Sequence, residues 1–76
     1  MSPRLPRVTA EELLRALERD GWYIHHQSGG HCQLKHPDKP GRRVTLQRHR
    51  MEVWPWLLTR ILDQAGMTAE ELRRLL

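Results

Sequence analysis

Residues 22–35 read "WYIHHQSGGHCQLK", two strand-like segments joined by a pair of glycines. In each segment apolar and polar residues alternate, which is the period of a half-buried β-strand. Residues 28–30 form a three-residue loop in which Gly29 and Gly30 can adopt positive φ. The stretch therefore predicts a β-hairpin, with His31 immediately after its turn.

The sequence on both sides of this hairpin completes a small fold. Residues 37–41 form a second turn rich in Pro and Gly, and residues 42–47 alternate again as a third strand. Apolar residues at helical spacing predict one helix over residues 10–20, a second over residues 57–65, and a short third helix after it. The order of elements is α-β-β-β-α-α.

Recognisable caps mark where these helices begin and end. Thr9 and Glu12 have the spacing of a capping box, as do Thr68 and Glu71. Pro55 suits the first turn of the second helix. Two glycines are expected to end the first two helices, Gly21 and Gly66.

Alternation divides the predicted sheet into two faces. One face is apolar and would pack against the helices: Trp22, Ile24, Cys32, Leu34, Val44 and Leu46. The other face is polar and would stay in water: Tyr23, His25, Gln27, His31, Gln33, Lys35, Arg43, Thr45 and Gln47. We therefore expect an α+β fold, in a single domain spanning residues 1–76, with a three-stranded antiparallel sheet and helices on one face.

Positive charge is concentrated in one part of the chain. The 76 residues include 13 Lys and Arg against 9 Asp and Glu, a net charge of +4. Residues 31–50 alone hold six Lys or Arg and one Asp, a net charge of +5. Such a basic segment is typical of a protein that binds phosphates, although a solvated hairpin can have the same composition.

Cysteine usage and hydropathy bear on location. The single cysteine, Cys32, cannot form an internal disulfide, and the first residues lack the apolar region of a secretory signal. No apolar run approaches the roughly 20 residues that span a bilayer. We expect a cytoplasmic protein that does not insert into membranes.

His31 is the first candidate for chemistry. If the hairpin closes across Gln27 and His31, His25 lies opposite Gln33 and diagonal to His31, roughly 7–8 Å away. Histidine exchanges protons near neutral pH, as cleavage of a phosphodiester by a neighbouring 2′-hydroxyl requires at both ends of the reaction. The alternative interpretation is an ordinary surface histidine.

Several residues that commonly ligate metals lie in or near the hairpin: His25, His26, His31, Cys32 and His36. Neither a CxxC pair nor a helical HxxxH pair is present, and His31 and Cys32 point to opposite faces of a strand. We therefore expect no metal site and no cofactor.

Trp54-Pro55-Trp56 places two large rings around a helix-starting proline. Because the chain has no Phe, at least one of these rings is expected in the core. An exposed ring would mark a partner site.

The chain resembles the HicA toxin family, small ribonucleases of bacterial and archaeal toxin–antitoxin pairs. Four segments carry the resemblance, in the order that the family has them: "TAEELLRALERDGW" (9–22), "SGGHCQLKHPD" (28–38), "RRVTLQRH" (42–49) and "LTRILDQAGMTAEEL" (58–72). The resemblance implies a fold similar to the double-stranded RNA-binding domain, and metal-independent cleavage of mRNA that arrests translation. It also implies neutralisation by a HicB-like antitoxin in a hetero-oligomer. The family's catalytic histidine, which follows the glycine turn, falls on His31.

Three positions depart from the family's usual pattern. Gly30 replaces the serine of Gly-Ser-His, residues 47–49 read Gln-Arg-His in place of Pro-x-His, and Trp56-Leu57 replaces Gly-Thr. The first departure bears on the rate of RNA cleavage more than on the functional class of the protein. The last adds bulk near a surface that an antitoxin would cover.

The leading hypothesis is a HicA-like endoribonuclease in which His31 and His25 act as general acid and base. The predicted RNA-binding residues are Lys35, Arg42, Arg43 and Arg48, and the predicted antitoxin contacts are Trp54 and Trp56. Other candidates for the second catalytic group are His36, His49 and Lys35. Two alternatives stay open, a catalytically silent RNA-binding module of the same fold and a pure interaction domain that docks through the two tryptophans.

Overall fold

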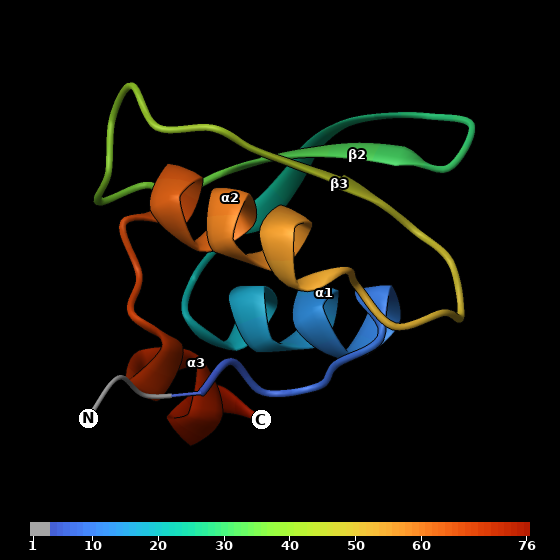
Figure 1. Ribbon diagram of the computed structural model, residues 1–76. Coiled ribbons are helices and arrows are strands. Elements are labelled where there is room, and N and C mark those ends of the chain that lie inside the picture. Colours follow the sequence, from blue (N-terminus) through green and yellow to red (C-terminus); the bar gives the residue numbers. More distant parts are fainter. Residues whose placement is uncertain (1–3) are drawn as a thin grey trace.

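The computed structural model describes residues 4–76 and has the predicted order of one helix, three strands and two helices (Figure 1). The elements are α1 (Ala10–Arg19), β1 (Tyr23–Ser28), β2 (His31–Lys35), β3 (Val44–Gln47), α2 (Pro55–Ala65) and α3 (Ala69–Leu75). The three strands form one antiparallel sheet in the order β1-β2-β3. The predicted α+β layout is confirmed.

Both predicted capping boxes are present. The Thr9 hydroxyl accepts a hydrogen bond from the Glu12 amide (3.1 Å), and the Glu12 carboxylate accepts one from the Thr9 amide (2.9 Å). Thr68 and Glu71 repeat the arrangement at the start of α3. Each box satisfies amides that the first helical turn leaves unpaired, and this fixes where α1 and α3 begin.

The hairpin turn is shorter than the sequence indicates. Ser28 pairs with His31, so only Gly29 and Gly30 form the loop. Gly29 has φ 59°, whereas Gly30 has no positive φ. Positive φ at the first of two loop residues is the pattern of a type II′ turn, whose twist matches that of a hairpin. The expected closure across Gln27 and His31 is therefore wrong by one residue.

A β-bulge in β1 changes which residues face the solvent side of the sheet. Ile24 pairs with Leu34 but His26, not His25, pairs with Gln33, so His25 is the extra residue. Beyond the bulge, Gln27 pairs with buried Cys32 and lies on the helix side. The expectation that Gln27 shares a face with His31 is wrong, because a bulge shifts the alternation of all residues beyond it.

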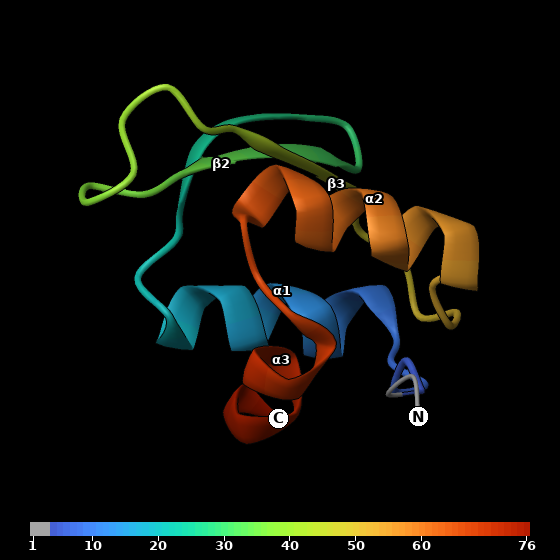
Figure 2. The same ribbon diagram turned by 60° about the vertical axis from the view of Figure 1, so that its left-hand side comes forward.

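All three helices lie on one side of the sheet (Figures 1 and 2). Figure 2 shows α1 and α2 beneath the strands and α3 beneath α1, farther from the sheet. The expected apolar face is confirmed: Trp22, Cys32, Leu34, Val44 and Leu46 are buried, and Ile24 is half-buried. These side chains join the apolar stripes of the helices in one core. The opposite face of the sheet, here called the outer face, is left uncovered by the helices.

Candidate functional site

Opposed residues of antiparallel strands share a face, so the register defines rows of side chains across the outer face. From the hairpin turn to the other end, the rows are Ser28, His31 and Gln47; His26, Gln33 and Thr45; Tyr23 and Lys35. His31 is exposed in the first row. The sequence therefore predicted its face correctly.

Backbone contacts fix the strand that carries His31. The Arg48 amide donates to the Gly30 carbonyl at 2.7 Å, which joins the end of β3 to the turn. The Arg48 guanidinium makes two hydrogen bonds to the Glu11 carboxylate, at 2.8 and 3.2 Å. This contact lowers the pKa of Glu11 and raises the pKa of Arg48. Arg48 thus connects the turn end of the sheet to α1.

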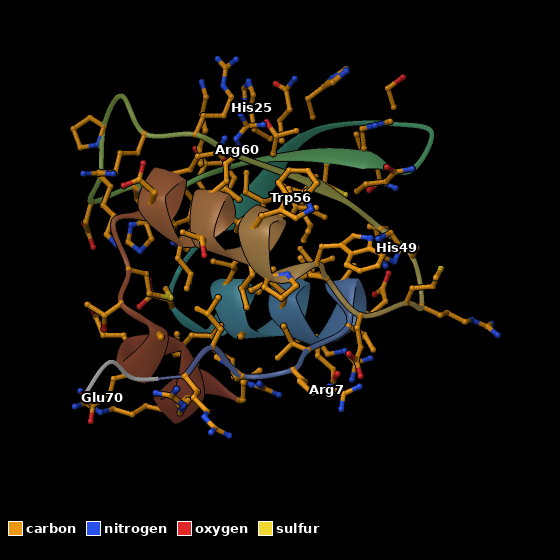
Figure 3. The ribbon with its side chains drawn as sticks, in the orientation of Figure 1. Arg7, His25, His49, Trp56, Arg60 and Glu70 are labelled. Atoms are coloured by element: carbon orange, nitrogen blue, oxygen red, sulfur yellow. The ribbon has the colours of Figure 1, made fainter. Side chains whose placement is uncertain are left out.

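Two histidines of β1 lie near His31. His26 is the diagonal neighbour of His31, because it precedes Ser28 by two residues. Diagonal neighbours are about 7–8 Å apart. His25, at the bulge, points away from the helices (Figure 3). The predicted pairing of His25 with Gln33 is wrong, and the register brings His26 to the position expected for His25.

The sequence offers little indication that His26 would lie on the outer face. After Ile24, β1 contains no apolar residue that would fix which side chains face the core. A strand that is polar on both faces specifies its register poorly. The absence of apolar residues in β1 after Ile24 is the only feature of the sequence that indicates a bulge there.

His36, one alternative for the second catalytic group, uses both ring nitrogens in hydrogen bonds within the fold. Its Nδ1 accepts a hydrogen bond from the Asp38 amide at 3.0 Å, so its proton lies on Nε2. Nε2 then donates to the Asp20 carbonyl at 2.7 Å, and the ring packs edge-on against Trp22 with centroids 5.4 Å apart. Both ring nitrogens are used, and the side chain holds the β2–β3 connection against the end of α1.

His49 and Lys35 are the other two alternatives. Nδ1 of His49 accepts from the Met51 amide at 3.1 Å, which leaves Nε2 without a hydrogen bond to the described residues. Lys35 lies four residues along β2 from His31, a separation of about 13 Å at the usual strand rise. Lys35 is therefore at the opposite end of β2 from His31, much farther from it than His26 is.

The predicted RNA-binding cations differ in how they are engaged. The Arg42 guanidinium donates to the Asp63 and Gln64 carbonyls at 3.1 and 3.2 Å and caps the end of α2. Arg48 is paired with Glu11, as described above. Among the described residues, Lys35 and Arg43 have no hydrogen bond or ion pair through their side chains to another protein group. Their charges are available to a ligand.

Both rings of the Trp54-Pro55-Trp56 segment are exposed. Trp54 is 68% exposed and Trp56 is 64% exposed, so the expectation that one of them enters the core is wrong. Trp22, at 2%, supplies the aromatic bulk of the core instead. Met51 is also 72% exposed. Figure 3 shows Trp56 and Arg60 on the same side of α2.

Metal binding and membrane crossing each need side chains or helices of a particular kind, and residues 4–76 lack both. No three His, Cys, Asp or Glu side chains lie close enough together to hold a metal ion. His31 and Cys32 point to opposite faces, as expected, with Cys32 buried. None of the helices in this range is long and apolar enough to cross a bilayer.

Comparison with known families matches residues 10–67 to the family described as "HicA toxin of bacterial toxin-antitoxin". The matched range contains α1, the whole sheet with its His31 turn, and α2. A search of curated proteins found no match. Since the family match covers more than half of the chain, this protein belongs to the HicA family, the toxins of toxin–antitoxin pairs, and has a cognate antitoxin as its partner.

Proposed function

We propose that this HicA-family toxin is a metal-independent endoribonuclease that cleaves mRNA and arrests translation. The observation that carries the proposal is the placement of His31: an exposed imidazole on a fixed hairpin, diagonal to His26 on the outer face. A side chain in this position contributes nothing to the core. It is available to a substrate that lies over the sheet.

The reaction needs one group that accepts a proton and one that donates a proton. A base removes the proton from a ribose 2′-hydroxyl, whose oxygen attacks the adjacent phosphorus. The bond from phosphorus to the 5′-oxygen breaks, and an acid protonates that leaving oxygen. The products are a 2′,3′-cyclic phosphate and a 5′-hydroxyl, and no metal or water enters this step.

We assign His31 to one of these two roles and a histidine of the β1 bulge to the other. The register favours His26 as the complement, since it is the diagonal neighbour of His31. His25, the residue predicted from the sequence, adjoins it and lies on the same side of the sheet in Figure 3. Single replacement of each histidine distinguishes the two.

RNA binding is proposed for the basic residues of the outer face. Lys35 and Arg43 are the direct phosphate contacts, because their charges have no protein partner among the described residues. Arg42 and Arg48, also predicted from the sequence, already donate to protein oxygens. Arg42 contributes mainly through its electric field, whereas the charge of Arg48 is balanced by Glu11, so Arg48 binds RNA only by leaving that ion pair. The charges of Lys35, Arg42 and Arg43 increase the local concentration of a polyanion.

A HicB-like antitoxin is proposed to dock on the exposed patch formed by Met51, Trp54 and Trp56. Three large apolar side chains lie within six residues of sequence, and each is more than half exposed. Aromatic side chains of this kind are enriched among the residues that dominate protein interfaces. The patch lies between the end of β3 and the first turn of α2, so an antitoxin in a hetero-oligomer would bind where the chain leaves the sheet.

The test is cleavage of an mRNA by the purified chain in the presence of a chelator, together with growth after induced expression. We expect His31→Ala to lower the cleavage rate by about 100-fold or more and to abolish growth arrest. Gln27→Ala is the matched control, because Gln27 is exposed on the same hairpin but lies on the other face. Unchanged cleavage by a folded His31→Ala protein would exclude His31 from catalysis.

The silent RNA-binding module is the second candidate. The observation that supports it is the pair of basic side chains, Lys35 and Arg43, which have no protein partner among the described residues and would bind RNA whether or not His31 is catalytic. This candidate predicts binding without cleavage in the same assay, and an affinity that falls steeply with salt. A protein that neither cleaves nor binds RNA would favour the interaction domain.

A further inference from the structure

An open pocket of about 380 Å³ lies at the end of the outer face opposite the His31 turn. Its lining includes Tyr23 and Lys35, which pair across β1 and β2, and residues of the β2–β3 connection. Figure 1 shows this connection, in yellow-green, and the β1–β2 turn at opposite ends of the sheet. The pocket and His31 are therefore two separate places on one surface.

The pocket is strongly basic, and its cations are of two kinds. Lys39 donates to the Ala65 carbonyl at 3.0 Å and lies over the Trp22 ring, while Arg42 caps α2. These two are committed to the fold, and the charge of Lys39 is partly balanced by Asp20, whose carboxylate lies 3.9 Å from the Lys39 ammonium nitrogen. Lys35 and Arg43 line the same pocket with no protein partner among the described residues. None of the lining residues is acidic, so the pocket suits a phosphate.

Tyr23 adds a recognition element of another kind. It is the first residue of β1, it lies directly opposite Lys35, and 48% of its surface is exposed. A large aromatic ring on the exposed face of a sheet is the platform on which single-stranded nucleic acids stack their bases. An aromatic face beside two free cations matches the combination of base and phosphate in one nucleotide.

We infer that this pocket anchors one nucleotide of a single-stranded RNA, with the base stacked on Tyr23 and the phosphate bound by Lys35 and Arg43. The inference rests on the proposed ribonuclease function and names its substrate as unpaired RNA. Tyr23 pairs with Lys35, which lies about 13 Å from His31 along β2, so Tyr23 and His31 are at opposite ends of the sheet. The anchored nucleotide is therefore not at the cleaved bond, and the strand must span the outer face between the two. A base inside a double helix cannot offer its face to Tyr23.

Binding tests the inference without depending on catalysis. In a full-length chain carrying His31→Ala, which cannot cleave if the proposed function holds, affinity for a fluorescent single-stranded 12-mer is measured by anisotropy. We expect Tyr23→Ala to weaken binding by about tenfold. Tyr23→Phe, which keeps the ring, should bind like the parent. Arg43→Gln should reduce the slope of log affinity against log salt by about 0.7, the value for one lost phosphate contact on a single strand.

Arg74→Gln is the matched charge control, because it removes one exposed arginine from α3, far from the sheet (Figure 1). The inference is overturned if Tyr23→Ala binds within twofold of the parent, or if Arg43→Gln and Arg74→Gln have the same effect. It is also overturned if a duplex of the same sequence binds as tightly as the single strand. That result would indicate recognition of A-form shape.

Cleavage provides the second readout and separates the two proposals. In a chain with His31 intact, Tyr23→Ala should raise KM for the 12-mer and leave kcat unchanged, since the anchor binds substrate and transition state equally. A lower kcat with unchanged KM would contradict the anchoring role. If no RNA is cleaved but the binding pattern holds, the ribonuclease proposal fails while the nucleotide pocket stands.

Discussion

Two glycines with positive φ stand at opposite ends of β1, and their surroundings differ. At Gly21, which precedes the strand, a Cβ would lie 2.7 Å from Nε2 of His36. At Gly29, in the hairpin turn, a Cβ would meet nothing within 4 Å. One glycine permits close packing and the other permits only a turn. Near Gly21, the side chains of His36, Lys39 and Arg42 are committed to structure, beside the exposed Tyr23. The turn end leaves His31 and Ser28 exposed.

Replacing each glycine with alanine should give the largest difference in the free energy of unfolding between the two ends of β1. Gly21→Ala forces a left-handed backbone, which costs about 1–2 kcal/mol, and displaces the His36 hydrogen bond, which costs about 1 kcal/mol more. Gly29→Ala incurs only the backbone cost, about 1–2 kcal/mol. Urea unfolding measures both. The two effects should differ clearly in the free energy of unfolding.

A double mutant sharpens this result. In a His36→Ala background the atoms that Gly21→Ala would strike are absent, so the cost of Gly21→Ala should fall by about 1 kcal/mol, to that of its backbone conformation alone. An equal cost of Gly21→Ala in both backgrounds would show that packing against His36 does not explain the glycine.

Replacing His36 should affect stability but not cleavage, and replacing His31 should affect cleavage but not stability. His36→Ala removes two hydrogen bonds and a ring contact with Trp22, and should destabilise the fold by about 2 kcal/mol. His31→Ala removes an exposed side chain and should change stability by less than about 0.5 kcal/mol. Unfolding curves test these values.

Cleavage assays should give the opposite order for the same pair of variants. Well below the unfolding midpoint, the His36→Ala protein should retain cleavage, and the His31→Ala protein should lose it. A folded His36→Ala protein without activity would return His36 to the list of catalytic candidates.

The sequence predicted features that depend on near neighbours in the chain. Thr9 with Glu12 and Thr68 with Glu71 satisfy helix amides three residues away, so their spacing alone identifies the helix starts. The apolar alternation of β2 and β3 likewise placed His31 on the outer face. These predictions required no knowledge of the tertiary fold.

The features that the sequence could not predict depend on contacts between distant segments. Arg48 pairs with Glu11, 37 positions earlier, and Arg42 caps a helix end 21 positions later. No local pattern distinguishes these arginines from Arg43, whose side chain makes no hydrogen bond or ion pair within residues 4–76. The bulge that places His26 rather than His25 opposite Gln33 could not be predicted either, because β1 has no apolar residue beyond Ile24 to fix which side chains face the core.

The smallest expected effect concerns Gly30, where the resembling family usually has serine. Gly30 has no positive φ, and a Cβ there would lie 3.4 Å from the Arg48 carbonyl oxygen and 3.8 Å from Cγ of Gln47, both ordinary contacts. Serine therefore fits the second position of this turn. Because it restricts the unfolded chain, Gly30→Ser should stabilise the protein by about 0.4–1 kcal/mol, measured by urea unfolding.

The same variant separates the two roles that a serine could have next to His31. If the residue only shapes the turn, Gly30→Ser should leave kcat unchanged, because Gly29 already provides the positive φ that the turn requires. We expect this outcome. A clear rise in kcat, with Gly30→Ala unchanged as the control without a hydroxyl, would contradict it and place the hydroxyl in the chemistry beside His31.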